Sequence, residues 1–271
     1  EAFKRCESEA KAAFGNGALF VERLVRRARH VEVQIIGDGS DVVHLHEREC
    51  TIQRRHQKLI EIAPSPTLTA ALRTAITEAA VKIARETKYQ SLGTFEFLVD
   101  ADSGEFFFIE ANPRLQVEHT VTEEVTGVDL VMTQLRIAGG AALSSLHVES
   151  TAPRGFAIQM RINAETIDAN GQTKPSAGTL TAFEPPSGPG VRVDTYGYAG
   201  YTTNPSFDSL LAKLIVHSRS LRFEDTARRA ARALSEFRIA GLATNAGFLE
   251  KIVTHPDFVA GRVTTRFVDE H

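Results

Sequence analysis

Residues 93–112 read Gly-Thr-Phe-Glu-Phe-Leu-Val-Asp-Ala-Asp-Ser-Gly-Glu-Phe-Phe-Phe-Ile-Glu-Ala-Asn, and this pattern predicts a β-hairpin. Two runs of aromatic and branched residues are separated by Asp-Ser-Gly, which is typical of a turn. Folding the segment about Ser103 brings Glu96 opposite Glu110. Two carboxylates directly across a sheet repel each other, and a divalent cation between them would remove that conflict.

Asn112 supports the interpretation of this hairpin as a metal site. It follows Glu110 by two residues and therefore lies on the same face of the strand, where it adds a third oxygen ligand. Oxygen ligands of this kind suit Mg²⁺ or Mn²⁺ that hold nucleotide phosphates, rather than zinc. The alternative is a pair of edge-strand glutamates that face water.

A polar cluster follows the predicted metal site directly. Arg114, Gln116, Glu118 and His119 occur within a few residues of one another. An arginine fork suits a planar oxyanion, and a nearby carboxylate can accept a proton. The same residues could form a plain polar loop, but their place beside the predicted metal site favours a catalytic cluster.

Composition excludes several classes of protein. A hydrophobic content of 42% and a charged content of 24% are ordinary for a soluble globular protein, and a net charge of −3 gives no argument for nucleic acid or an anionic membrane. The sequence contains no apolar run that could span a bilayer and no signal-peptide pattern. Its two cysteines, Cys6 and Cys50, form neither a disulfide framework nor a metal motif, which favours a reducing compartment.

A shift in composition predicts that the chain consists of two units. A composition shift near residues 140–155, which includes Ser150, Thr151 and Pro153, predicts a boundary, with units at 1–150 and 151–271. The expected helices are residues 2–14, 67–87, 119–126, 129–138, 223–237 and 244–253. The expected strands are residues 19–21, 31–35, 42–45, 93–100, 105–112, 155–164, 178–183, 190–195 and 214–217.

Several motifs together resemble biotin carboxylases, the ATP-grasp enzymes that form the first half-site of biotin-dependent carboxylases. They read His30-Val-Glu-Val-Gln34, Glu47-Arg-Glu-Cys50, Gln53-Arg-Arg-His56-Gln-Lys58, Gly93-Thr-Phe-Glu96-Phe, Glu110-Ala-Asn112-Pro-Arg114-Leu-Gln116-Val-Glu118-His119, Arg161-Ile-Asn-Ala-Glu165, Ala199-Gly-Tyr201 and Phe207-Asp-Ser-Leu-Leu-Ala-Lys213-Leu. The resemblance implies an α+β fold. A partial ATP-grasp domain with an antiparallel sheet and helices would cover 1–150, and a biotin carboxylase C-terminal α/β domain would cover 151–271.

The resemblance also implies a role for each matching position. The residues that would contact ATP are Glu22, Leu24, Val25, His30, Gln53, His56, Glu96 and Glu110. Among them, the segment from Glu22 to Val25 would meet the adenine, and His30, Gln53 and His56 would lie near the sugar and phosphates. The ligands of Mg²⁺ or Mn²⁺ would be Glu96, Glu110 and Asn112. The bicarbonate-binding residues would be Lys58, Arg114, Gln116 and Val117. The catalytic residues would be Arg114, Glu118 and Arg161, with Glu118 deprotonating bicarbonate and Arg161 binding biotin and stabilising its enolate.

The implied activity is that of a ligase, which carboxylates biotin on a carrier protein with ATP and bicarbonate through carboxyphosphate. Its cofactors would be ATP, Mg²⁺ or Mn²⁺, and biotin as the carrier-bound substrate. Its partners would be a biotin carboxyl carrier domain or protein, a carboxyltransferase component and a second copy of the chain, without nucleic acid or membrane. The expected location is the cytoplasm, or the mitochondrial matrix in a eukaryote.

Departures from the family pattern lead to further expectations. The N-terminal domain and the glycine-rich lid that precede the matching region in the family are not in this sequence. We therefore interpret the chain as a C-terminal fragment with little or no carboxylase activity alone, since phosphate positioning supplies most of the catalysis. Thr120 replaces a common proline and Phe207 a common tyrosine, which favours carboxylases that fuse several domains.

Two other functions remain as alternatives. One is a carbamoyl-phosphate synthetase-type ATP-grasp ligase, which shares the fold and the carboxylate pair. The segments Arg161–Glu165 and Phe207–Ser209 count against it, because they resemble motifs specific to biotin carboxylation. The other is a non-catalytic lobe that serves structure or dimerisation, and binding of Mg-ATP would distinguish it from an enzyme.

Overall fold

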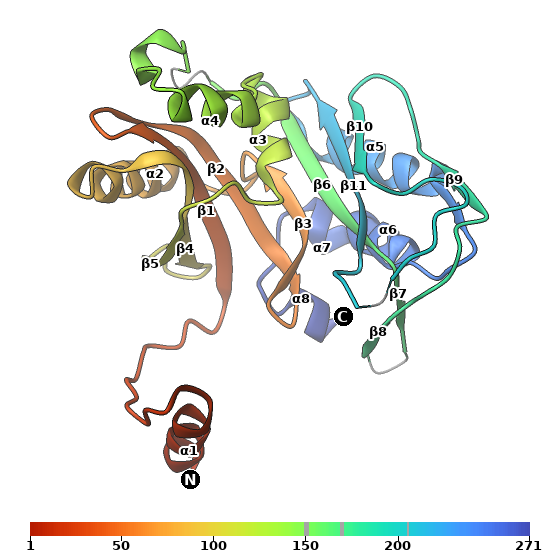
Figure 1. Cartoon of the computed structure of the whole chain (residues 1–271), viewed down its shortest axis with the longest axis horizontal. Helices are drawn as coiled ribbons and strands as arrows, with labels where there is room; N and C mark the ends of the chain where they lie inside the picture. Colours follow the sequence, from red (N-terminus) through yellow and green to blue (C-terminus); the bar gives the residue numbers. More distant parts are fainter. Residues whose placement is uncertain (149–151, 169–170, 205) are drawn as a thin grey trace.

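The computed structural model describes residues 1–148, 152–168, 171–204 and 206–271. Its centre is an eight-stranded sheet in the order β10-β11-β6-β3-β2-β1-β4-β5, in which all neighbouring strands run antiparallel (Figure 1). This arrangement confirms the predicted mixture of helices and an antiparallel sheet. The strands are β1 (Ala28–Asp38), β2 (Val42–Arg54), β3 (Gln57–Ala63), β4 (Gln90–Asp100), β5 (Phe106–Asn112), β6 (Phe156–Asn163), β10 (Val191–Thr195) and β11 (Leu210–Ser218).

Helices lie on both faces of this sheet except α1, which stands apart from it, and two small sheets lie beside it (Figure 1). The small sheets pair β7 (Glu165–Ile167) with β8 (Thr173–Pro175) and β9 (Ala182–Glu184) with β12 (Arg238–Ala240). The helices are α1 (Ala2–Phe14), α2 (Ala70–Glu86), α3 (His119–Thr126), α4 (Leu130–Ala138), the 3₁₀ turn η1 (Leu143–Ser145), α5 (Phe223–Glu236), α6 (Ala246–Thr254), α7 (Pro256–Val259) and α8 (Phe267–Glu270).

Two separate hydrophobic clusters lie along one face of the sheet. In β1, Val31 and Val33 are fully buried and pack with Ile76 of α2. Farther along the same face, Met160 of β6 packs with Leu234 of α5. Burial of these apolar side chains is the main force that holds α2 and α5 against the sheet.

The opposite face of β1 carries the polar side chains of the alternating pattern. His30, Glu32 and Gln34 are all buried, with exposed fractions of 8%, 0% and 1%. The sequence predicts one buried face and one polar face, whereas the structure buries both. Charged groups are buried only when they are paired, so this face requires compensating charges from neighbouring strands.

Two expectations about strands differ from the structure. The predicted strand at 19–21 is wrong, because residues 16–25 form no regular structure and Phe20 and Val21 are more than 80% exposed. No described strand pairs with this segment, so β propensity alone does not form a strand there. The returning strand predicted at 42–45 extends to Arg54 and continues through a turn at Arg55 and His56 into β3.

The predicted boundary at 150 lies outside the described residues. The large sheet nevertheless contains strands from both sides of it, because β6 pairs with β3 on one edge and with β11 on the other. The division into units at 1–150 and 151–271 therefore remains a prediction. None of the described helices is both long and apolar enough to cross a membrane.

Candidate active site

The β4–β5 hairpin has the predicted register. Glu96 pairs directly with Glu110, and Thr94 pairs with Asn112. Asn112 Nδ2 donates to Glu96 Oε1 at 3.0 Å and to Glu110 Oε1 at 2.9 Å, so one point between the two carboxylates is within reach of both. A 180° rotation of the amide would place its oxygen there, and two carboxylates with an amide oxygen suit a hard divalent cation. The residues therefore fit the metal that the sequence predicts.

His30 connects this acidic pair to the neighbouring strands. Its Nε2 lies 2.7 Å from Glu96 Oε2, and its Nδ1 lies 2.7 Å from Gln53 Nε2. The Gln53 amide nitrogen also donates to the backbone carbonyl of Cys50 at 2.9 Å, which fixes the amide beside the His30 ring. Gln53 thus orients a side chain that lines the cavity without lining it itself.

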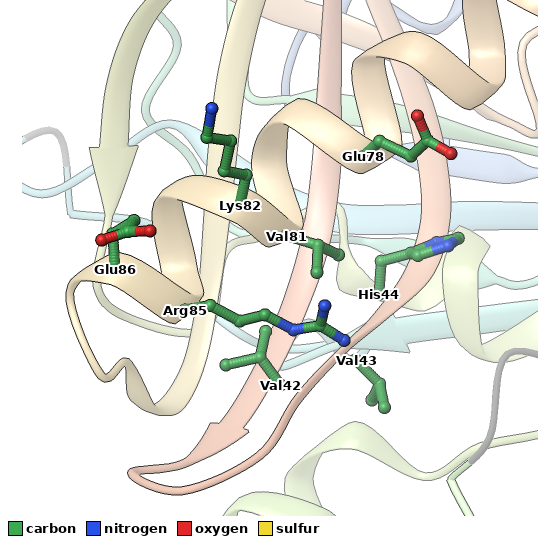
Figure 2. A pocket seen from close by; sticks show the side chains of 8 residues that line it. All are labelled: Val42, Val43, His44, Glu78, Val81, Lys82, Arg85 and Glu86. Atoms are coloured by element: carbon green, nitrogen blue, oxygen red, sulfur yellow. The ribbon is translucent and has the colours of Figure 1, made fainter.

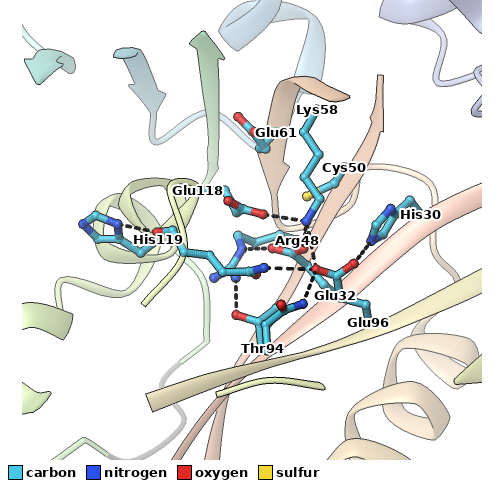
Figure 3. A network of polar contacts seen from close by, with 12 residues as sticks. His30, Glu32, Arg48, Cys50, Lys58, Glu61, Thr94, Glu96, Glu118 and His119 are labelled. Atoms are coloured by element: carbon cyan, nitrogen blue, oxygen red, sulfur yellow. Dashed lines mark hydrogen bonds and ion pairs between the residues drawn. The ribbon is translucent and has the colours of Figure 1, made fainter. Parts of the chain in front are cut away.

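Lys58, on β3, lies at the centre of a network of charges (Figure 3). Its Nζ is 2.6 Å from Glu32 Oε2, 3.0 Å from Glu96 Oε1 and 2.6 Å from Glu118 Oε1. Burial acts to lower the pKa of Lys58, but Glu32 and the other acidic neighbours outweigh it and raise the pKa above its usual range. Lys58 therefore stays charged, which compensates the acidic groups around it.

Glu118 lies between two cations. One carboxylate oxygen contacts Lys58, and the other lies 3.1 Å from the guanidinium of Arg161, which also forms an ion pair with the fully buried Glu61. The residue directly precedes α3, so the start of that helix fixes its backbone. A carboxylate held in this way has a defined orientation and can accept a proton from a ligand that enters between the two cations.

Electrostatics keep two of the acids ionised and disfavour ionisation of a third. Burial acts to raise the pKa of Glu96, but the hydrogen bond from His30 and the charge of Lys58 outweigh it and lower the pKa to about 2. Burial has the same tendency at Glu32, where Arg48 and Lys58 lower the pKa to about 2. Burial raises the pKa of Glu61, and the charge of Arg161 offsets only part of that effect.

These side chains surround a cavity of about 410 Å³. Most of the predicted site residues line it, including Glu110, Asn112, Gln116 and Val117. Its lining residues are His30, His56, Gln57, Lys58, Glu96, Glu110, Asn112, Arg114, Gln116, Val117, Glu118, Arg161, Asn163, Asp208, Ser209 and Leu210. The guanidinium of Arg114 has no carboxylate partner among the described residues, so the cavity has a free cation that can bind an anion.

The predicted adenine-contacting segment is separate from this cavity. Glu22, Leu24 and Val25 belong to the irregular segment after α1, and none of them lines the cavity. Leu24 is 76% exposed. The structure therefore brings together the residues predicted for metal, phosphate and bicarbonate, but not those predicted for the base of the nucleotide.

Three charged residues of the network are not among the site residues that the sequence predicts. Glu32, Arg48 and Glu61 are each fully buried. Arg48 donates to Glu32, Gln34, Thr94 and Thr122, which joins β1, β2, β4 and α3. The signal that identifies Glu96, a charge within an apolar strand, is also present in Val-Glu-Val at 31–33 and in Leu-Ile-Glu-Ile at 59–62.

A second hollow of about 570 Å³ lies between β2 and α2 (Figure 2). Val42, Val43 and Val81 line it together with charged side chains of α2, which point in different directions rather than toward a common centre. None of the predicted site residues lines this hollow. Convergence of polar groups marks a ligand site, so the smaller cavity is the better candidate.

The fold and the site define an ATP-grasp protein. Residues 1–146 match the family model described as "Carbamoyl-phosphate synthase L chain, ATP binding domain", and residues 159–270 match the "Biotin carboxylase C-terminal domain". The chain belongs to the biotin carboxylase family.

Curated relatives agree with this assignment. Pyruvate carboxylase 1 of Caenorhabditis elegans is 47% identical over 275 residues, which cover 100% of this chain and 23% of the relative. The mitochondrial pyruvate carboxylase of Homo sapiens is 46% identical over 275 residues, with the same coverage of 100% and 23%. The chain thus spans about a quarter of the length of these relatives.

A solved structure gives the same result. The biotin carboxylase domain dimer of Hydrogenobacter thermophilus 2-oxoglutarate carboxylase, in complex with MgADP, ADP and bicarbonate, has a TM-score of 0.90 and 42% identity. The match covers 100% of this chain and 58% of that chain. At this identity the likeness extends to the family as well as to the fold.

Proposed function

We propose that this chain contributes the biotin carboxylase site of a biotin-dependent carboxylase, which uses ATP and bicarbonate to carboxylate biotin. The observation that carries the proposal is Glu118, which is held between Lys58 and Arg161 and faces the cavity that also contains Glu96 and Glu110. One cavity thus combines a proton acceptor, cations for an anion and carboxylates for a metal.

In the proposed first step, Glu118 takes the proton of bicarbonate, and Lys58 and Arg114 bind its oxygens. Gln116 and the backbone of Val117 complete this anion site. The deprotonated bicarbonate attacks the γ-phosphorus of ATP, so that ADP leaves and carboxyphosphate forms.

A Mg²⁺ or Mn²⁺ ion held by Glu96, Glu110 and Asn112 would neutralise the charge that builds up on the phosphates. His30, Gln53, His56 and the segment that contains Glu22, Leu24 and Val25 would contact the nucleotide.

In the second step, carboxyphosphate breaks down to carbon dioxide and phosphate. The phosphate removes the proton from the ureido nitrogen of biotin, and the resulting enolate attacks carbon dioxide through that nitrogen. We assign stabilisation of the enolate to Arg161, whose positive charge lies where the negative charge develops. Arg161 is available for this role because Glu61 holds its guanidinium at the edge of the cavity.

The partners follow from the same proposal. Biotin would arrive on a carrier domain or protein, and a carboxyltransferase component would pass the carboxyl group to the final acceptor. A homodimer is part of the proposal, because the Hydrogenobacter thermophilus domain is described as a dimer. The proposed location is the cytoplasm, or the mitochondrial matrix in a eukaryote, since the human relative is mitochondrial.

The test is an assay of biotin- and bicarbonate-dependent ADP formation by the whole protein, with Glu118→Gln and Arg161→Ala beside the wild type. We expect each variant to lose roughly 10²- to 10⁴-fold in biotin-dependent turnover, the range that a positioned proton acceptor contributes. Arg228→Ala is the control, because the Arg228 side chain is 72% exposed and lines no part of the cavity.

Each outcome has a defined meaning. Normal turnover in Glu118→Gln or Arg161→Ala would contradict the role of that residue. Bicarbonate-dependent ATP hydrolysis whose rate does not change when biotin is added would favour a carbamoyl-phosphate synthetase-type ligase. Failure of the whole protein to bind Mg-ATP in a calorimetric titration would favour a non-catalytic lobe.

A further inference from the structure

A row of three charged residues crosses the strands next to the cavity. Arg161 on β6 pairs with Lys213 on β11, and Lys213 pairs with Asp194 on β10. Paired residues of an antiparallel sheet project from the same face, so two cations and one carboxylate form a line. Arg161 lines the cavity, whereas Lys213 and Asp194 do not.

The two cations of this row contact consecutive residues of the loop that carries Glu118. Lys213 Nζ donates to the backbone carbonyl of Val117 at 3.2 Å, and Arg161 lies 3.1 Å from the Glu118 carboxylate. Lys213 therefore restrains the peptide group that joins Val117 to Glu118. Arg161 restrains the side chain that this peptide group positions.

The row is costly to assemble, because like charges directly across a sheet destabilise it. Asp194 offsets the cost, since its Oδ2 lies 3.2 Å from Lys213 Nζ. Burial acts to raise the pKa of Asp194, but Arg192 and Lys213 outweigh it and lower the pKa below its usual range. The carboxylate therefore stays ionised beside Lys213, whose side chain is only 13% exposed.

Arg192 links Asp194 to helix α3, which follows Glu118 directly. It donates to both oxygens of Asp194, at 2.8 and 3.0 Å, and to Glu123 of α3 at 2.8 Å. Because α3 starts at the residue after Glu118, the backbone around Glu118 is held both before it, at Val117, and after it, at Glu123.

We propose that Lys213, oriented by Asp194, is a positioning residue that sets the direction of the Glu118 carboxylate through the Val117 carbonyl. The inference rests on the proposed function, in which Glu118 accepts the proton of bicarbonate. Without Lys213, the peptide between Val117 and Glu118 can rotate, and the carboxylate leaves its place between Lys58 and Arg161. A misplacement of about 1 Å at a reacting group can cost about 10²-fold in rate.

The experiment compares Lys213→Met with Lys213→Arg and with Arg73→Met in the whole protein. Arg73 is a matched control, because it also holds a carboxylate, that of Glu47, and a backbone carbonyl, that of Ser65, while lining no part of the cavity. We expect Lys213→Met to lower kcat for biotin-dependent ADP formation by roughly 10- to 100-fold, with KM for MgATP unchanged. Lys213→Arg should recover most of kcat, since a guanidinium can also donate to both oxygens.

Arg73→Met should lose stability while keeping its kcat. A similar loss of kcat in Arg73→Met, or normal kcat in Lys213→Met, would overturn the inference.

A crystal structure of Lys213→Met provides a readout that does not depend on activity. We expect a rotated Val117 carbonyl and a Glu118 carboxylate that has left Arg161, and an unmoved Glu118 would overturn the inference even in a protein that carboxylates biotin. Absence of activity in the wild type would instead contradict the proposed function.

Discussion

The hydrogen-bonding capacity of Lys58 is fully used in the structure. Its ammonium group has three donors, and each of them meets a different carboxylate. An anion can therefore bind Lys58 only if one of these contacts lengthens. Glu118 can give way more easily than Glu32, since Arg161 still holds its other oxygen and Glu32 is fully enclosed. Binding of bicarbonate would thus free one oxygen of Glu118 at the moment when a proton acceptor is required.

The acids of the site also make stability depend on pH. The pKa of Glu96 falls from 4.5 to about 2 in the folded state, so between these values the unfolded state binds more protons. Its contribution to stability is complete above pH 4.5 and is lost as the pH falls through 2. We expect the free energy of unfolding to decrease over this window in urea titrations, with a smaller slope in Glu96→Gln. Equal slopes in the two proteins would contradict the assignment.

At the residue scale, the sequence predicts the side chains whose partners are local. Glu96 and Glu110 could be paired from the sequence, because a short turn sets their register. Glu61 and Lys213 could not, because their partners lie on distant strands, as with Lys213 and Val117 at a separation of 96 residues. Their apolar neighbours indicate burial, but only the order of the strands shows what compensates the charge.

At the element scale, α5 shows how a helix is matched to the sheet. Its buried face has three alanines in the middle, with Phe223 at one end and Leu234 at the other, so small side chains face β11 and β6 between two larger ones. The acidic residues of its first turn, Glu224 and Asp225, interact favourably with the positive end of the helix dipole. The small buried side chains of α5 allow it to pack on the sheet, and the acidic residues of its first turn stabilise the helix itself.

Leu234 gives a direct test of this packing. It is 4% exposed and belongs to the large core cluster, so Leu234→Ala should destabilise the protein by about 2–5 kcal/mol, as for other leucines in cores. Leu221→Ala is the matched control, because Leu221 is 88% exposed and its loss should change stability by less than about 0.5 kcal/mol. Chemical denaturation measures both values, and equal losses would contradict the packing described for α5.

Elements with a long hydrophobic stripe could be predicted from the sequence, and short ones could not. The helices α2 and α5 begin and end within a few residues of their predicted limits. The strands β7, β8 and β12 have three residues each, and only pairing with a partner strand defines them. Residues 19–21 show the reverse case, in which a suitable composition finds no partner among the described residues.

At the scale of the whole molecule, the large sheet joins the two predicted units. Because β6 hydrogen-bonds to β3 and β11, strands before and after residue 150 share one set of backbone hydrogen bonds and one buried face. The site depends on this union, since Glu118 comes from one side and Arg161 from the other. Neither half could form the complete site alone.

A shared sheet should unfold in a single transition. The sequence contains no tryptophan, so Phe106→Trp and Phe156→Trp each introduce a unique fluorescent probe, one on each side of residue 150. We expect both probes and the far-UV circular dichroism to give the same urea midpoint. Two separate midpoints would instead support independent units at 1–150 and 151–271.

The position of β6 also has a consequence for synthesis of the chain on the ribosome. When translation has reached residue 150, β3 is an open sheet edge, and Glu61 has yet to meet Arg161, which follows it by 100 residues. Open edges recruit other strands, so a nascent chain at this stage is a substrate for chaperones and for aggregation. Ribosomal stalling or a premature stop codon in this interval would yield insoluble products rather than a protein with partial activity.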